Sequence, residues 1–273
     1  EEALALFQKR AAANPQDPNV HNHIAQTVLY WEMFRNGALE SELVTGTNPF
    51  VRRPNLNVTA ATTTQFHNSV AKVMEICEAR LVKDPNDTKA MYSMGVAYGL
   101  RANWNFPVKK GWRDSLRDAT EARKLHNRVT ELDGNFVDAR FVQAVHDYVV
   151  GSLPLTYKIL GFLVGFRGDR EEGMKMLRFV AEKGNLNRAD AAVLLSAILR
   201  REKRANDAIP LLAGLIKQFP RNYLLRMELS TMYGDIGDKT SAIAQLDQLE
   251  KLRAAGSAGL KKLSAERIDY AKG

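Results

Sequence analysis

A chain of 273 residues with 45% hydrophobic and 26% charged residues has the composition of an ordinary globular protein. It is long enough to bury a large core, or to form a stack of units that each contact only their neighbours. The basic residues behind the net charge of +8 are mixed with acids in most segments, which argues against nucleic acid as a partner. The longest apolar run, near residue 160, is interrupted by Lys158 and is too short to span a membrane. The single cysteine, Cys77, excludes an internal disulfide framework and a cysteine-cluster zinc site.

The first 36 residues predict two helices joined by a proline turn. Residues 1–13 carry Leu4 and Phe7 on one helical face, and Pro18 suits the first position of a helix over residues 18–36. The spacing in residues 1–13 matches the second helix of a helix pair, so we expect the chain to be trimmed at its N-terminus. No leader pattern is present, and the compartment stays open between the cytoplasm and an exported or periplasmic location.

Residues 37–57 interrupt the helical pattern and form the first of three predicted insertions. Gly37, Pro49 and Pro54 indicate an extended loop. A long helix is predicted to follow over residues 59–83. Repeat arrays carry such insertions on one edge or face, often the functional one. The alternative is a loop that packs back over the groove.

The second insertion, residues 101–117, combines aromatic and basic side chains. It lies between a first helix that begins at residue 88 and the partner helix of that pair. The partner helix begins later in the chain than a regular helix pair would place it. The aromatic and basic residues singled out are Trp104, Lys109, Lys110, Trp112 and Arg113. Cations beside aromatic rings suit an anionic or aromatic ligand, and the three cations are candidate anion contacts. The same residues would equally cap a helix pair, with tryptophan packed inward and lysines in solvent.

The third insertion, residues 151–168, lies between a first helix at residues 137–150 and a second helix at residues 169–183. Pro154 suits the start of a short helix and Gly168 suits its end. This helix is apolar nearly all round, so it must be buried against the stack, a partner or a membrane surface. As a docking helix, its contact residues would be Leu160, Phe162, Leu163 and Phe166.

Residues 189–222 and residues 223–256 repeat one pattern with a shift of 34 residues, so that Leu195 corresponds to Leu229. A period of this length is typical of a helix–turn–helix unit that stacks on copies of itself. The pattern resembles the tetratricopeptide repeat family. That resemblance implies an all-α fold: a right-handed superhelical stack of antiparallel helix pairs, or α-solenoid, with inserted loops and short helices. It implies one domain over residues 1–273 with about five to six helix pairs, closed by a capping helix at residues 259–271.

A segment beside the third insertion resembles the tetratricopeptide repeat protein 39 family, which includes the inclusion-body clearance protein. The matching residues are Gly165-Phe166-Arg167-Gly168-Asp169-Arg170, followed by Glu171 and Gly173. Members of that family are treated as adaptors, some near membranes or lipid droplets. The resemblance implies no catalytic residues.

Chemical motifs give no indication of catalysis. The sequence contains no glycine-rich phosphate loop, zinc-protease motif, EF-hand or nucleophile elbow, so we expect no enzyme, no cofactor and no metal site. Tetratricopeptide arrays that bind carboxylate-ended peptides use a clamp of Lys, Arg and Asn on their first helices. Among the corresponding positions of this chain, only Lys89 fits that clamp. The predicted groove is apolar and aromatic instead. Its candidate binding residues are Tyr92, Val96, Trp104, Trp112, Phe141, Val145 and Tyr148.

Three functional hypotheses follow. The first is a non-catalytic helical-repeat scaffold that binds a protein or peptide through this groove or through the inserted segments. The second is a small-ligand or lipid-handling component, which resembles the tetratricopeptide-like periplasmic subunit of TRAP-type transport systems and would hold a hydrophobic small ligand in a cavity. The third is binding to an anionic surface through Lys109, Lys110 and Arg113, either as peripheral contact with a membrane or as contact with nucleic acid. The oligomeric state stays open.

Overall fold

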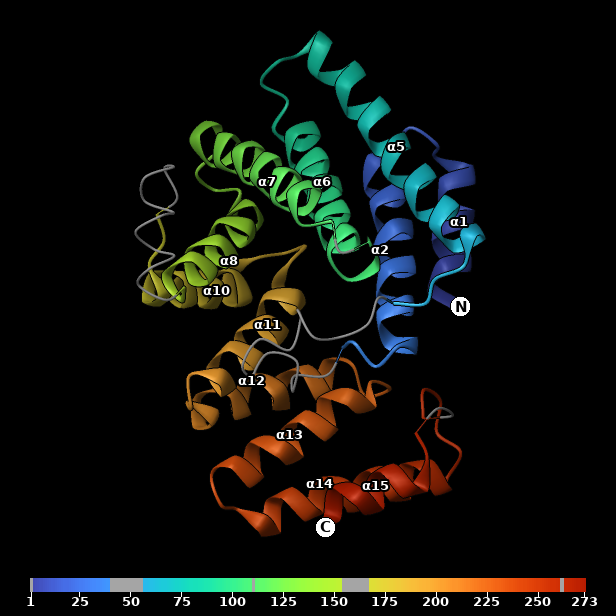
Figure 1. Cartoon of the computed structure of the whole chain (residues 1–273), viewed down its shortest axis with the longest axis vertical. Coiled ribbons are helices and arrows are strands. Elements are labelled where there is room, and N and C mark those ends of the chain that lie inside the picture. Colours follow the sequence, from blue (N-terminus) through green and yellow to red (C-terminus); the bar gives the residue numbers. More distant parts are fainter. Residues whose placement is uncertain (1, 40–55, 110, 154–166, 261–262) are drawn as a thin grey trace. The chain divides into compact units, whose positions relative to one another are not determined.

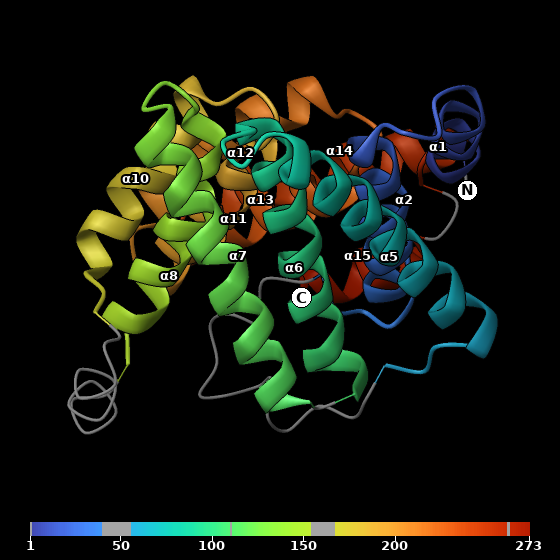
Figure 2. The same ribbon diagram turned by 90° about the horizontal axis from the view of Figure 1, so that it is seen from above.

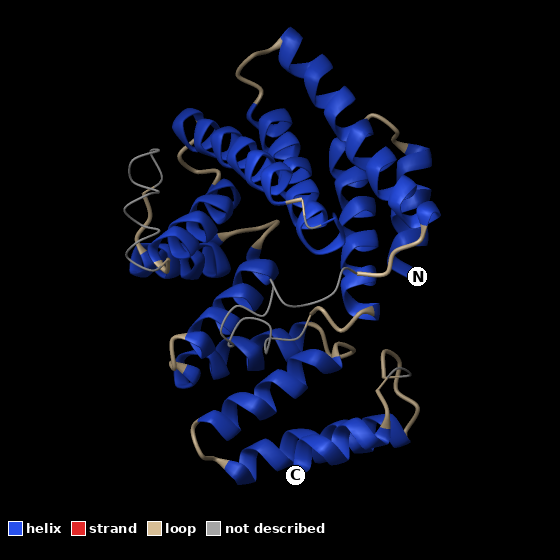
Figure 3. Ribbon diagram, in the orientation of Figure 1, coloured by secondary structure: helices blue, strands red, loops and turns tan. Residues whose placement is uncertain are grey.

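The computed structural model describes residues 2–39, 56–109, 111–153, 167–260 and 263–273. Figure 3 shows that these residues form helices joined by turns, and no strand occurs among them. The fold class is therefore all-α, built from antiparallel helix pairs in chain order, as the repeat pattern predicts. The chain divides into two compact units. Among the described residues, unit 1 contains those up to Leu39 and those from residue 56 to Met176, and unit 2 contains those from Leu177 to Gly273.

In unit 1, successive helices pack on one another in sequence order (Figure 1). They are α1 (Glu2–Ala13), α2 (Pro18–Arg35), α5 (Ala60–Lys83), α6 (Thr88–Lys109), α7 (Trp112–Leu132), the 3₁₀ helix η1 (Val137–Ala139) and α8 (Arg140–Gly151). The next helix, α10 (Arg170–Lys183), begins in unit 1 and ends in unit 2. Local chemistry sets the helix starts: Asp17 accepts a hydrogen bond from the Asn19 N–H, and Pro18 is the first residue of α2.

The second insertion does not form a separate loop. Helix α6 continues to Lys109 and α7 begins at Trp112, so the extra residues lengthen both helices of one hairpin. Figure 2 shows the end of this hairpin extending past α8 of the same unit. Trp104, in the lengthened part of α6, is fully buried and stacks on Phe66 of α5 with ring centroids 4.1 Å apart.

Unit 2 contains the two regular repeats and a final helix. The helices are α11 (Arg188–Arg201), α12 (Ala205–Gln218), α13 (Tyr223–Asp235), α14 (Lys239–Ala254) and α15 (Ala265–Lys272). Small buried residues let paired helices approach: the Ser230 hydroxyl donates to the carbonyl oxygen of Ala242 at 2.9 Å. Gly237, in the turn between α13 and α14, has a φ of +82°, which costs glycine little. Helix α15 begins later than predicted because Ser264 caps it, accepting a hydrogen bond from the Arg267 N–H.

A histidine is buried between α6 and α7. The His126 side chain stacks on Tyr92 at 5.1 Å and fits against Gly95, where an added Cβ would collide with the imidazole. Its Nε2 donates to the carbonyl oxygen of Tyr92 at 3.3 Å. Burial lowers the pKa of His126 to about 4, so the ring is neutral in the folded protein at neutral pH.

We expect His126 to make unit 1 less stable in mild acid. The unfolded chain protonates this side chain near its ordinary pKa of 6.5, whereas the folded chain does so only near 4. Unfolding therefore takes up a proton between these values, and the free energy of unfolding falls as the pH falls. Between about pH 7 and about pH 5, His126 should contribute about 2 kcal/mol to that loss.

Urea unfolding at the two pH values measures this contribution. The substitution His126→Gln should reduce the pH dependence by that amount, whatever it does to stability at neutral pH. The partly exposed His21 provides the matched control: His21→Gln makes the same replacement outside the α6–α7 pair, and the reduction in pH dependence should be larger in His126→Gln. An unchanged slope in His126→Gln would show that the buried ring does not set the acid sensitivity.

Candidate functional site

Three of the seven predicted groove residues lie in the core rather than on an open face. Tyr92, with 4% of its surface exposed, packs against His126 and Phe136. Trp104 is fully buried, and Tyr148 is 3% exposed. Their assignment to a partner-binding groove is therefore corrected: each aromatic ring fills the space between helices of its own unit. Sequence spacing places a residue on a helical face, but it does not say whether another helix covers that face.

The other predicted contacts divide into two groups. Val96, Phe141 and Val145 are half-buried, and their role as groove residues stays a prediction. The apolar docking residues Leu160, Phe162, Leu163 and Phe166, and the cation Lys110, lie outside the described residues. Most of the first insertion, residues 40–55, also lies outside them.

The segment that resembles the tetratricopeptide repeat protein 39 family has a structural role at the start of α10. The Asp169 carboxylate accepts hydrogen bonds from the backbone N–H groups of Glu171 (2.8 Å) and Glu172 (3.0 Å), which caps the helix. Gly173, one turn later, lies against the α8 backbone, where a Cβ would come within 2.5 Å of the Tyr148 nitrogen. Aspartate and glycine are thus needed here for helix capping and close packing.

The end of the α6–α7 hairpin is the candidate surface site in unit 1. We define the hairpin tip as the described residues of 105–117. Trp112 is the first residue of α7, and 56% of its surface is exposed. Leu116, one turn later, is 58% exposed. The Phe106 ring meets the Trp112 ring edge-on at 4.8 Å. Of the two tryptophans predicted to line one site, Trp112 is thus on the surface and Trp104 is in the core.

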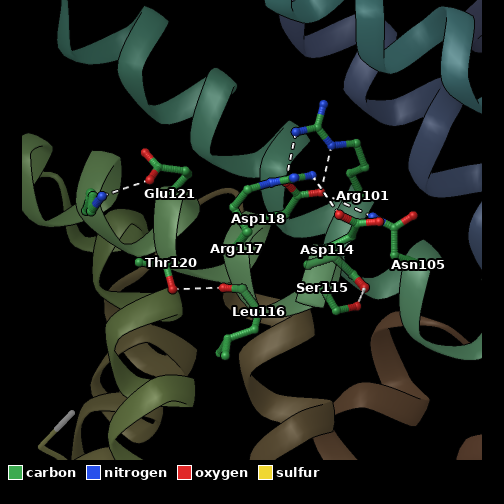
Figure 4. A network of polar contacts seen from close by, with 11 residues as sticks. Arg101, Asn105, Asp114, Ser115, Leu116, Arg117, Asp118, Thr120 and Glu121 are labelled. Carbon is green, nitrogen blue, oxygen red and sulfur yellow. Dashed lines mark hydrogen bonds and ion pairs between the residues drawn. The ribbon is translucent and has the colours of Figure 1, made fainter. Parts of the chain in front are cut away.

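A buried carboxylate fixes the base of this hairpin (Figure 4). Asp118 of α7 is fully buried and accepts hydrogen bonds from Arg101 Nε at 2.7 Å and Arg101 Nη2 at 2.8 Å. The Asn105 amide donates to the same carboxylate at 3.2 Å, and Arg117 Nε lies 3.5 Å from it. The bond to Asp118 raises the pKa of Arg101 above its ordinary value. In Figure 4 the Leu116 side chain points away from this network, toward the opposite side of α7.

Unit 2 leaves apolar side chains partly or largely accessible at equivalent positions of neighbouring first helices, a feature that the predictions missed. Val193 of α11 is 46% exposed, and the residue 34 positions later, Met227 of α13, is half-buried. Arg200 of α11 joins the two helices, because its guanidinium reaches Glu228 at 3.5 Å and Asp235 at 2.7 Å, both on α13. We call this surface the first-helix face. It consists of Val193, Leu194, Ala197, Leu224 and Met227.

The described residues also bear on metal binding and membrane insertion. Within the described ranges, no group of three or more His, Cys, Asp and Glu side chains could hold a metal ion. Over the same ranges, no helix combines the length and the apolar character needed to cross a membrane.

Comparison with known proteins gives no family assignment. No family model matches the sequence, and no curated protein sequence matches it. Among solved structures, a monomeric mutant of IFIT1 with Gppp-AAAA is similar at 16% identity and a TM-score of 0.33, covering 91% of this chain and 57% of that one. The human IFIT1 dimer with PPP-AAAA is similar at 17% identity and a TM-score of 0.31, covering 92% and 58%. The chain spans less than two thirds of these proteins, and TM-scores of this size do not establish a shared arrangement of helices.

Proposed function

We propose that the chain is a non-catalytic helical-repeat scaffold that binds a protein partner through the first-helix face of unit 2. The observation that carries this proposal is the exposure of Val193 at a position that recurs as Met227 on the neighbouring first helix. Val193 is exposed and Met227 is half-buried on neighbouring first helices, and water solvates such apolar side chains poorly. Burial of such a surface is the main favourable term in protein association.

The surroundings of Val193 and Met227 suit a docking surface. The ion pairs of Arg200 with Glu228 and Asp235 hold α11 and α13 side by side, so this face needs no reordering when a partner binds. Arg200 is largely buried, with 12% of its side chain exposed, and its charge is matched by the two carboxylates. An apolar centre with charged groups at its edge is the arrangement typical of protein interfaces.

The alternative function, enclosure of a small hydrophobic ligand, receives no support from the aromatic residues of unit 1. A ligand-handling protein would need those residues to surround a hollow. Trp104 instead stacks on Phe66 at 4.1 Å, and Tyr92 stacks on His126 at 5.1 Å. Each of these rings is in contact with another ring of unit 1, which does not favour a hollow between them.

Site-specific photo-crosslinking at position 193 tests the proposed function. The captured protein is identified and purified, and its affinity is measured by calorimetry against the full chain. We expect Val193→Asp and Met227→Asp each to weaken binding by about tenfold or more, because each buries an unpaired carboxylate in the interface.

The matched control is Val82→Asp, which introduces the same charge at a valine of α5 that is 85% exposed. It should bind as the wild type does, and circular dichroism should report unchanged helicity in all three variants. If the captured protein binds Val193→Asp as tightly as the wild type, the first-helix face is not its docking surface.

A further inference from the structure

The hairpin tip presents two large apolar side chains to solvent. Trp112 and Leu116 lie one turn apart on α7, and each exposes more than half of its surface. Single exposed apolar residues are ordinary, but two on adjacent turns at a projecting helix end form a small apolar surface. The Phe106 ring lies perpendicular to the Trp112 ring and in contact with it.

Two exposed cations lie close in the chain to this apolar pair. Lys109 ends α6 and Arg113 lies in the first turn of α7, and both are exposed. Asp114 is the one carboxylate among the described tip residues, and Arg117 pairs with it at 3.1 Å. The charges of Lys109 and Arg113 are therefore not compensated by a carboxylate within the described tip, which favours an anionic partner.

Hydrogen bonds within the hairpin stabilise the conformation of the described tip residues. The Gly111 N–H donates to the carbonyl oxygen of Asn105 at 3.0 Å, which closes the turn between the helices. The Ser115 hydroxyl donates to the carbonyl oxygen of Ala102 at 2.6 Å. Together with the Asp118 network, these bonds order the backbone of the tip in the absence of a partner. Binding therefore carries little entropic cost for ordering that backbone.

We infer that the hairpin tip binds the surface of an anionic phospholipid bilayer. Tryptophan is favoured at the boundary between headgroups and acyl chains, where the ring is buried and its N–H stays hydrated. Leu116 would enter the same boundary, while Lys109 and Arg113 would attract the anionic headgroups. A projecting end meets a flat surface without needing a complementary pocket. Single-stranded nucleic acid would use the Trp112 ring and the cations, but it has no group that suits an exposed leucine.

Vesicle binding by the full chain tests this inference. The vesicles are phosphatidylcholine with about one third phosphatidylserine, and the measurements are co-sedimentation and tryptophan emission at low salt. We expect binding that weakens as salt is raised, together with a blue shift in emission. The shift should disappear in Trp112→Phe, which keeps an aromatic ring at the tip and should still sediment with the vesicles.

Two double variants separate the charges from the apolar pair. Replacing Lys109 and Arg113 by glutamine should lower the partition coefficient about thirtyfold, and Trp112→Ser with Leu116→Ser should abolish the sedimentation. The matched control replaces the exposed Lys9 and Lys217 by glutamine and removes the same net charge elsewhere.

Three outcomes would overturn the inference: no binding to the anionic vesicles by the wild type, equal loss in the tip and control variants, or binding to vesicles of phosphatidylcholine alone at the same strength. Tip-dependent binding to a single-stranded oligonucleotide, with no vesicle binding, would instead identify a nucleic-acid surface. None of these results depends on the first-helix face of unit 2.

Discussion

We expect Gly173→Ala to lower the free energy of unfolding of unit 1 by about 3 kcal/mol, although it adds a single methyl group. The added Cβ would lie 2.5 Å from the backbone nitrogen of Tyr148 and 2.8 Å from the carbonyl oxygen of Ala144. Both are backbone atoms of α8, so no side-chain rotation relieves the contact. Helices α8 and α10 would have to separate, and the packing around the buried Tyr148 side chain would loosen.

Urea unfolding followed by tryptophan fluorescence measures this effect in the relevant unit, because Trp31, Trp104 and Trp112 all lie in unit 1. Gly99→Ala is the matched control: Gly99 lies inside α6, and its Cβ would meet nothing within 4 Å. Alanine is the better helix former, so the control should gain about 0.5–1 kcal/mol. A similar gain for Gly173→Ala would refute the close approach of α8 and α10.

The sequence predicted the building unit because that unit depends on local periodicity. The 34-residue shift between residues 189–222 and residues 223–256, and the turn signals at Pro18 and Gly237, act within one helix pair. The all-α class and the boundaries of the N-terminal helices follow from such local signals.

The site was less predictable because burial is a tertiary property. Trp104 and Trp112 looked alike in the sequence, yet one packs on Phe66 and the other opens α7 at the surface. Which helix covers a given face is decided by neighbours far away in the sequence, and no local pattern records it. The missed position, Val193, had a usable signal: its repeat partner Met227 is also apolar on a face where solvated residues are expected.

The second large effect is expected for Asp118→Ala, which should destabilise unit 1 by about 4 kcal/mol. The substitution removes a fully buried carboxylate and leaves the Arg101 guanidinium, 29% exposed, without its bidentate partner. The Asn105 amide, in a residue that is 5% exposed, also loses its acceptor. Removing one member of such a pair is costly because the remaining charge is left unpaired at a site that water reaches only in part.

Two further variants identify the cause of that loss. Asp114→Ala removes a carboxylate of the same helix whose side chain is 56% exposed and pairs with the exposed Arg117, so it should change stability by less than about 1 kcal/mol. Replacing Arg101 and Asp118 together by methionine and leucine removes both charges, and it should recover much of the stability lost in Asp118→Ala. If Asp118→Ala unfolds at the same urea concentration as Asp114→Ala, the buried network does not hold the hairpin. Recovery of stability in the double variant would show that the loss in Asp118→Ala arises from the unpaired Arg101 charge. The double variant keeps the packing volume of the two side chains but removes both charges.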